Sequence, residues 1–226
     1  MEADEISILL LADIHGSGFL IDEIAEEIRS ADVIVLSGDI THFGTADDCA
    51  LVLDSIRKYN DRILAVAGNC DHPDVDDYLR EQKVNPSLEG VRSRGFAWFG
   101  ISGSLPCPGT TPFEYTEKEA ETMLSKIRGN YNKEIPNIMI THQPPYDTVA
   151  DKLTNGVHVG SRSIRNFIEE RSPLLCLTGH IHEGIGTDQI NSCYIVNPGP
   201  FRTGKYARIR ITGENSVNID LRQITA

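Results

Sequence analysis

The stretch ISILLLADIH, from Ile6 to His15, decides the fold that we expect for this chain. Its first part, Ile6–Ala12, is almost continuously apolar and rich in branched side chains, which is typical of a strand buried on both faces. Asp13 and His15 follow at once. Fully buried strands belong to parallel sheets covered by helices, and such sheets bind ligands beyond the carboxyl ends of their strands. The stretch therefore predicts an α/β fold with functional groups at one sheet edge.

Strands and helices alternate through the first half of the chain. Val33–Ser37 and Ile63–Ala67 have the composition of further buried strands. Between the strands, Phe19–Ser30 and Thr45–Tyr59 carry apolar residues at helical spacing. This alternation predicts parallel strands that are joined by right-handed crossovers.

The second half mixes hairpins, strands and helices. Val91–Arg94 and Phe96–Ile101 are predicted to form a hairpin. Together, the elements predict two mixed sheets packed face to face with helices outside, in one domain of residues 1–226. The remaining predicted elements are helices over residues 116–128 and 161–171 and strands over residues 138–141, 174–178, 192–196, 206–212 and 216–221.

The composition of the chain limits the kinds of partner and the cellular location that we expect. The net charge of −12 gives an acidic surface, which repels nucleic-acid duplexes and anionic membranes but not a phosphate ligand held by cations. The apolar runs are too short for a membrane span, and the acidic N-terminus lacks the basic region of a signal peptide. The five cysteines contain no CxxC pair, which favours a reducing cytoplasm. The oligomeric state stays open, a homo-oligomer included.

Acidic, amide and imidazole groups recur just after the apolar runs. Short motifs such as Asp-x-His or Gly-Asp are weak alone, because most are turns or solvated loops. A shared site is predicted because all of these motifs occur together, each at the end of an apolar run. The candidate metal ligands are Asp13, His15, Asp39, Asn69, His142, His180 and His182.

This mixture of groups suits two divalent ions. Carboxylates neutralise the charge, and imidazoles favour Mn, Fe, Zn, Co or Ni over Ca. A carboxylate between two ions about 3.5–4 Å apart can bridge them, and the pair can hold a hydroxide that attacks phosphorus at neutral pH. We expect Mn²⁺ first and a small phosphate ester as the substrate.

The motifs DxH, GD, GNxD, H and GHxH resemble those of the calcineurin-like metallophosphoesterase superfamily. The segments His142–Pro145, His158–Ser161, Gly179–Glu183 and Val196–Pro200 are similar to the Icc-related predicted phosphoesterases. The resemblance implies a four-layer αββα sandwich and a bridging Asp39. It implies one metal at Asp13, His15, Asp39 and His182, and the other at Asp39, Asn69, His142 and His180.

One position departs from the family pattern. Many members carry a histidine that contacts the substrate, where this chain has Cys70. A thiol is a poor general acid at neutral pH. We therefore expect a preference for phosphodiesters, or for esters whose leaving groups need little protonation.

Other polar residues near the motifs allow two interpretations each. His42 either lines the pocket or lies behind the ligands, and His72 either replaces the missing acid or caps the next helix. Asp71 is more typical of a turn acceptor than of a ligand. His158 belongs to a polar loop that is either a lid or merely solvated. Ser161 suits a helix N-cap better than an anion site.

We therefore predict a binuclear, metal-dependent phosphoesterase. Asp39, Asn69 and His142 are the predicted catalytic residues, and Cys70, His42 and His158 are the predicted substrate contacts. The main alternative is a scaffold that keeps the fold but has lost catalysis. A second alternative is a nuclease acting on short single strands, since the acidic chain has no basic cluster for a duplex.

Overall fold

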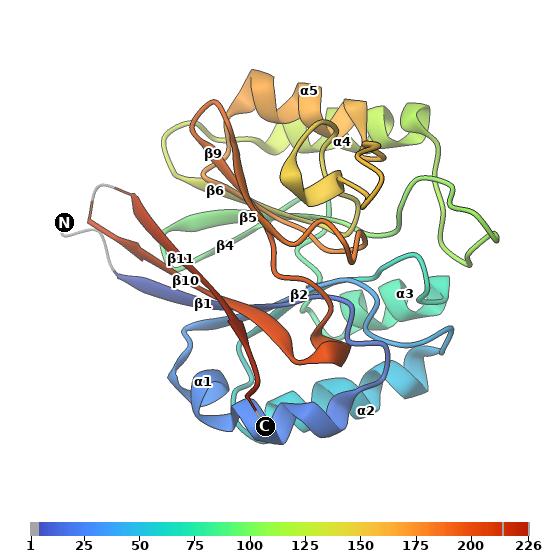
Figure 1. Cartoon of the computed structure of the whole chain (residues 1–226). Helices are drawn as coiled ribbons and strands as arrows, with labels where there is room; N and C mark the ends of the chain where they lie inside the picture. Colours follow the sequence, from blue (N-terminus) through green and yellow to red (C-terminus); the bar gives the residue numbers. More distant parts are fainter. Residues whose placement is uncertain (1–4, 214, 226) are drawn as a thin grey trace.

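Two β-sheets lie face to face, with helices on their outer sides (Figure 1). The structure is a computed structural model that describes residues 5–213 and 215–225. Glu214 and most of the acidic N-terminus therefore lie outside the described residues. The layers run helix, sheet, sheet, helix, which confirms the predicted α/β fold of two mixed sheets with flanking helices.

The first sheet begins with three parallel strands. These are β1 (Ile6–Leu11), β2 (Val33–Ser37) and β3 (Ile63–Val66), and the chain end adds β10 (Lys205–Thr212) and β11 (Ser216–Gln223) as antiparallel strands beside β1. Residues of β1 alternate between two cores because successive side chains of a strand point to opposite faces. Both faces are apolar, which explains the unbroken apolar runs.

The second sheet has a parallel centre and antiparallel edges. The predicted hairpin is present as β4 paired with β5, and β5, β6, β7 and β9 run parallel. The polar edge strand β8 was not predicted, because its half-exposed sequence GTDQI lacks an apolar run. The bounds are β4 Val91–Ser93, β5 Phe96–Ile101, β6 Asn137–Thr141, β7 Leu175–Leu177, β8 Gly186–Ile190 and β9 Cys193–Asn197.

The helices cover the outer face of each sheet (Figure 1). α1 (Ala25–Ser30), α2 (Ala46–Arg57) and α3 (Pro73–Glu81) pack on the first sheet, and α4 (Glu117–Asn130) and α5 (Arg162–Arg171) pack on the second. None of the helices in the described residues is long and apolar enough to cross a membrane.

The prediction of one helix over Phe19–Ser30 was wrong in its first half. Gly18–Ile24 forms a 3₁₀ helix, and α1 begins only at Ala25. Ile21 and Ile24 are its buried residues, and their spacing of three matches the tighter 3₁₀ period. Two further 3₁₀ turns are Val149–Asp151 and Phe201–Thr203.

The backbone amides at the N-terminus of α5 donate hydrogen bonds to side chains of the same protein. Ser161 is the N-cap, because its Oγ accepts a hydrogen bond from the Ile164 amide at 3.2 Å. Glu117, at the start of α4, accepts further bonds from the Arg162 amide at 2.7 Å and the Ser163 amide at 3.1 Å. A side-chain carboxylate therefore already occupies the place where an anion would bind.

Candidate metal centre

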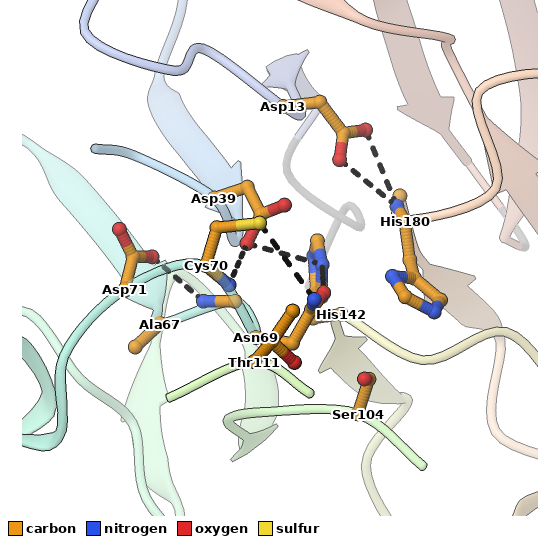
Figure 2. A network of polar contacts seen from close by, with 12 residues as sticks. Asp13, Asp39, Ala67, Asn69, Cys70, Asp71, Ser104, Thr111, His142 and His180 are labelled. Atoms are coloured by element: carbon orange, nitrogen blue, oxygen red, sulfur yellow. Dashed lines mark hydrogen bonds and ion pairs between the residues drawn. The ribbon is translucent and has the colours of Figure 1, made fainter. Parts of the chain in front are cut away.

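The seven predicted ligands all lie in the loops that follow strands. Asp13 and His15 follow β1, Asp39 follows β2, and Asn69 follows β3. The second sheet supplies His142 after β6, and His180 and His182 after β7. Figure 2 shows that Asp13, Asp39, Asn69, His142 and His180 converge from these separate segments.

Several of these residues have an unusual backbone. Asp13, His15, Asp39 and His180 are left-handed, with φ of 53°, 47°, 49° and 68°. Residues with side chains rarely adopt this conformation, which costs on the order of 1–3 kcal/mol each. Such strain clusters at functional sites, where it directs side chains toward a shared point.

The motif glycines make room for the candidate ligands. A β-carbon on Gly38 would collide with the His142 ring, and one on Gly68 would collide with the Asp39 carboxylate. A β-carbon on Gly179 would approach Asp13 Oδ2 to 2.9 Å. Glycine is required at these positions because a candidate ligand fills the space of the side chain.

One half of the site joins Asp13, His15 and His182. The Nε2 atom of His182 lies 3.4 Å from Asp13 Oδ1, and the Nε2 atoms of His15 and His182 are also 3.4 Å apart. His15 Nε2 lies 3.6 Å from Asp39 Oδ2. The donors of Asp13, His15 and His182 all lie within 4.8 Å of one another.

The other half is built around His142. Its Nε2 lies 3.4 Å from Asp39 Oδ1 and 2.9 Å from Asn69 Oδ1, while its Nδ1 lies 2.8 Å from the Ser37 carbonyl. When Nδ1–H donates to that carbonyl, the Nε2 lone pair is free for a metal. The two oxygens of Asp39 thus face different imidazoles, as a bridging carboxylate requires.

The ring of His180 has less direct contacts with the other candidate ligands. Its backbone amide donates to both oxygens of Asp13, at 3.1 and 3.2 Å, and its ring centroid lies 5.0 Å from that of His142. Its Nε2 lies 3.9 Å from the sulfur of Cys107. Among the described residues, sets of three possible ligands whose donor atoms lie within 4.8 Å of one another include Asp13, His15, Asp39, His142 and His182. His180 belongs to none of these sets.

These residues fit divalent cations. Asp13 and Asp39 are almost completely buried, and among the described residues their ion-pair partners are histidines rather than lysine or arginine. Buried carboxylates are costly unless they are paired or coordinate a metal. His142 Nε2 lies 2.9 Å from Asn69 Oδ1 and His15 Nε2 lies 3.6 Å from Asp39 Oδ2, so the atoms of each pair are close enough to bind one cation together.

The charges in the pocket are strongly coupled. Burial has the largest single effect on the pKa of His142 and lowers it, but Asp39, Asp13 and the Ser37 carbonyl together raise it to about 9. Burial opposes the ionisation of Asp39, yet His142 and His15 hold its pKa below the ordinary value. Burial, followed by the nearby His142, lowers the pKa of His180 to about 4. A metal would take the place of the proton on His142.

The ring nitrogens that face away from the site also have neighbours. His15 Nδ1 lies 3.4 Å from His42 Nδ1, so the exposed His42 lies behind a candidate ligand. His182 Nδ1 lies 3.3 Å from the guanidinium of Arg202. The sequence analysis did not identify Arg202, because it lies in the connection after β9, without a motif of its own.

Two half-buried cysteines flank Asn69. The sulfurs of Cys70 and Cys107 each lie 3.7 Å from Asn69 Nδ2, and the Cys70 amide donates to Asp39 Oδ1 at 2.8 Å. Burial, together with Asp39, raises the pKa of the Cys70 thiol far above its usual value. Cys107 was missed because it lies in an irregular loop between two prolines.

The remaining polar candidates support loops. Asp71 is buried and accepts hydrogen bonds from the amides of Gly68, Ile40 and Thr41 at 2.7, 3.1 and 2.7 Å, so it is a turn acceptor. Its burial, and then Asp39, raise its pKa to about 6. His72 occupies the N-cap position of α3.

His158 is paired away from the candidate ligands. Its Nδ1 lies 2.7 Å from Asp151, and within the described part of the chain its ion-pair partners are Asp147 and Asp151. A substrate contact by His158 remains a prediction.

Comparisons with known proteins identify the same family that the sequence motifs resemble. The family model of the calcineurin-like phosphoesterases matches residues 6–184. An uncharacterised protein of Methanocaldococcus jannaschii, MJ1162, is 38% identical over 200 residues, or 86% of this chain and 88% of that protein.

Solved structures show the same fold. The protein TT1561 of Thermus thermophilus superposes with a TM-score of 0.75 at 20% identity, covering 98% of this chain and 100% of that one. The yellow lupin purple acid phosphatase PPD1 has a TM-score of 0.58 at 11% identity, covering 98% of this chain and 52% of that one. With the family match spanning most of its length, the chain belongs to the calcineurin-like phosphoesterases.

Proposed function

We propose that this chain hydrolyses phosphodiesters at a centre of two divalent ions. The observation that carries the proposal is the position of Asp39. Its Oδ2 faces His15 at 3.6 Å and its Oδ1 faces His142 at 3.4 Å, so one carboxylate links two groups of ligands. The family supports a phosphoric ester hydrolase, and the finer assignment rests on this geometry.

The chain offers a ligand set for each ion. When bound, the ions lower the pKa of water and offset negative charge on the phosphate. Mn²⁺ is the first ion that we propose, with Fe, Zn, Co and Ni as the alternatives that the same donors accept. Asp13, His15, Asp39 and His182 would hold one ion, and Asp39, Asn69, His142 and His180 the other.

Residues around the ligands fix their orientation. Ser37 and His42 face the outer nitrogens of His142 and His15, which holds the inner nitrogens toward Asp39. Cys70 is a weak proton donor because burial favours its neutral thiol. A site with a poor acid favours esters whose leaving groups depart without protonation, which supports the choice of phosphodiesters.

Three further features of the proposal concern the molecule as a whole. We propose that residues 1–226 act as one domain on a small phosphate-ester substrate. The five cysteines are all free, which supports the cytoplasmic location that we propose.

Hydrolysis of bis-p-nitrophenyl phosphate with added Mn²⁺ tests the proposal. We expect turnover, and a loss of about a thousandfold or more in Asp39→Ala and His142→Ala, because each removes a metal ligand. His72→Ala is the matched control, because that exposed histidine lies at the N-cap position of α3 without a side-chain capping hydrogen bond and should leave the rate unchanged. Faster turnover of p-nitrophenyl phosphate than of the diester would contradict the preference for diesters.

A further inference from the structure

The side-chain amide of Asn69 has different partners on its oxygen and on its nitrogen. Its Oδ1 lies 2.9 Å from His142 Nε2, within the candidate metal centre (Figure 2). Its Nδ2 donates hydrogen bonds to the sulfurs of Cys70 and Cys107, each at 3.7 Å. An NH₂ group has two hydrogens, and a sulfur is a weak acceptor, so the two sulfurs can use both hydrogens.

The direction of this amide decides whether Asn69 can bind a metal. An amide binds a cation through its oxygen, whereas its nitrogen acts only as a donor. If the amide turned over, Nδ2 would face His142 Nε2 and the ion would lose a ligand. In the metal-free protein the turned form would gain a hydrogen bond from Nδ2 to that ring nitrogen. The site therefore needs a contact that keeps the nitrogen of Asn69 away from His142.

Cys107 supplies such a contact because its own hydrogen has another acceptor. A thiol has one hydrogen, and the Cys107 thiol donates to the Leu105 carbonyl oxygen at 3.4 Å. His180 Nε2, a possible second acceptor, lies farther away at 3.9 Å. With its hydrogen used in this way, the sulfur can accept a hydrogen bond from Asn69 Nδ2 but can offer none to Oδ1.

The loop that carries Cys107 is attached both to Asn69 and to itself. It lies between β5 and α4. The Phe113 amide donates to the backbone carbonyl of Asn69 at 3.2 Å. The carboxylate of Glu114 accepts hydrogen bonds from the amides of Cys107 and Thr111, at 3.2 and 2.9 Å. The sulfur of Cys107 is therefore held beside the Asn69 amide by contacts that need no metal.

We infer that Cys70 and Cys107 are positioning residues, which accept hydrogen bonds from the nitrogen of Asn69 and so hold its oxygen toward the metal centre. The inference rests on the proposed function, which assigns Asn69 to one of the two ions. Removing a partner that orients a metal ligand lowers metal affinity by roughly tenfold to a hundredfold. Neither cysteine needs to bind the ion itself for this effect.

Nuclear magnetic resonance of the metal-free protein tests the contact. We would follow the exchange with water of the two Nδ2 protons of Asn69, which are identified by their absence in Asn69→Ala. We expect one proton to exchange about fivefold faster in Cys107→Ala and the other in Cys70→Ala, because each variant removes one acceptor. Cys107→Ser keeps an acceptor and should recover part of the protection. Unchanged exchange in both alanine variants would overturn the inference.

Calorimetric titration with Mn²⁺ tests whether the contact positions a ligand. Cys107→Ala should weaken the binding of one of the two ions by roughly tenfold or more, and Cys107→Ser by less. In the Asn69→Ala background, Cys107→Ala should cause no further loss, because the group that it orients is gone. Losses that simply add in the double variant would mean that Cys107 acts independently of Asn69, which would contradict the positioning role.

Cys193→Ala is the matched control for the removal of a thiol. Cys193 is a buried, free cysteine of β9 whose thiol donates to the Tyr194 carbonyl oxygen. The variant should keep the wild-type affinity for both ions. A loss as large as that of Cys107→Ala would show that removing any thiol weakens the site, and the inference would be wrong.

The two readouts also separate this inference from the proposed function. Binding of two ions and turnover of bis-p-nitrophenyl phosphate, both unchanged in the cysteine variants, would leave the proposed function standing and overturn the positioning role. A protein that binds no ion although both Asn69 protons are protected would overturn the proposed function, and the positioning role would then also be wrong.

Discussion

Individual residues of the site leave little freedom for substitution, and the glycines show this most clearly. Gly38 has a φ of 97° and lies against the His142 ring, whereas Gly95 has a φ of 80° with nothing within 4 Å of an added β-carbon. The two positions share the backbone requirement and differ in the contact. They therefore separate the cost of a left-handed backbone from the cost of displacing a ligand.

Gly38→Ala should be clearly more destabilising than Gly95→Ala. Both substitutions strain the backbone, at about 1 kcal/mol, but only the first also pushes His142 out of place, for which we expect roughly 2 kcal/mol more. Urea unfolding measures the stability, and Mn²⁺ titration should show weakened binding only in Gly38→Ala. Equal losses at the two sites would show that the His142 contact is unimportant.

The charge state of His142 predicts how the metal-free protein responds to pH. Its folded pKa of about 9 lies above the ordinary 6.5, because Asp39, Asp13 and the Ser37 carbonyl together outweigh burial. The stabilisation is complete below about pH 6.5 and is lost as the pH rises through 9. We expect on the order of 1–3 kcal/mol of lost stability between these limits.

Urea unfolding of the metal-free wild type and of His142→Gln measures this loss. The variant should show a flatter dependence on pH over the same window, since it lacks the titrating group. The apparent affinity for Mn²⁺ should rise with pH in the wild type, because the proton on His142 competes with the metal. A wild-type stability that increases from pH 6.5 to 9 would contradict the assignment.

At the scale of elements, strand ends could be predicted far better than connections. The buried strands and the loop residues that follow them were predicted because apolar composition marks where a strand ends. Cys107 and Arg202 lie in connections, where only the packing of loops brings them to Asn69 and His182. The 3₁₀ helix Gly18–Ile24 was predicted as α-helix because three- and four-residue spacings look alike over one turn.

One carboxylate at the start of α4 joins that helix to the N-terminus of α5 by hydrogen bonds. Glu117 accepts hydrogen bonds from the Ser161 hydroxyl and from the first amides of α5. Glu117→Ala should therefore destabilise the protein by about 1–2 kcal/mol.

Glu121→Ala is the control for this prediction. Glu121 lies on the same helix and pairs with Arg128 at the surface, where an ion pair contributes less than about 1 kcal/mol. Thermal unfolding compares the two variants. A larger effect of Glu121→Ala would mean that the carboxylate at the start of α5 is not the stabilising contact.

For the whole molecule, the candidate site is where the two sheets join. The first sheet supplies Asp13, Asp39 and Asn69, and the second supplies His142, His180 and His182. Metal ions bound there would connect the two halves of the sandwich. The candidate ligands could be proposed from the sequence, but the link from Asp39 to both His15 and His142 is visible only when the sheets are packed.

Metal removal should therefore weaken the whole fold. Binding to the native state alone stabilises a protein by about 2.7 kcal/mol when the free ligand is at a hundred times its dissociation constant. We expect a chelator to lower the midpoint of thermal unfolding, and added Mn²⁺ to restore it in the wild type but not in Asp39→Ala. An unchanged midpoint after complete metal removal would show that the sheets need no ions to hold them together.

The position of metal ions in a crystal tests the central claim most directly. Anomalous scattering from crystals grown with Mn²⁺ should give two peaks about 3.5–4 Å apart, one on each side of the Asp39 carboxylate. The first should lie among Asp13, His15 and His182, and the second beside Asn69 and His142. A single peak, or no peak between these side chains, would contradict the account.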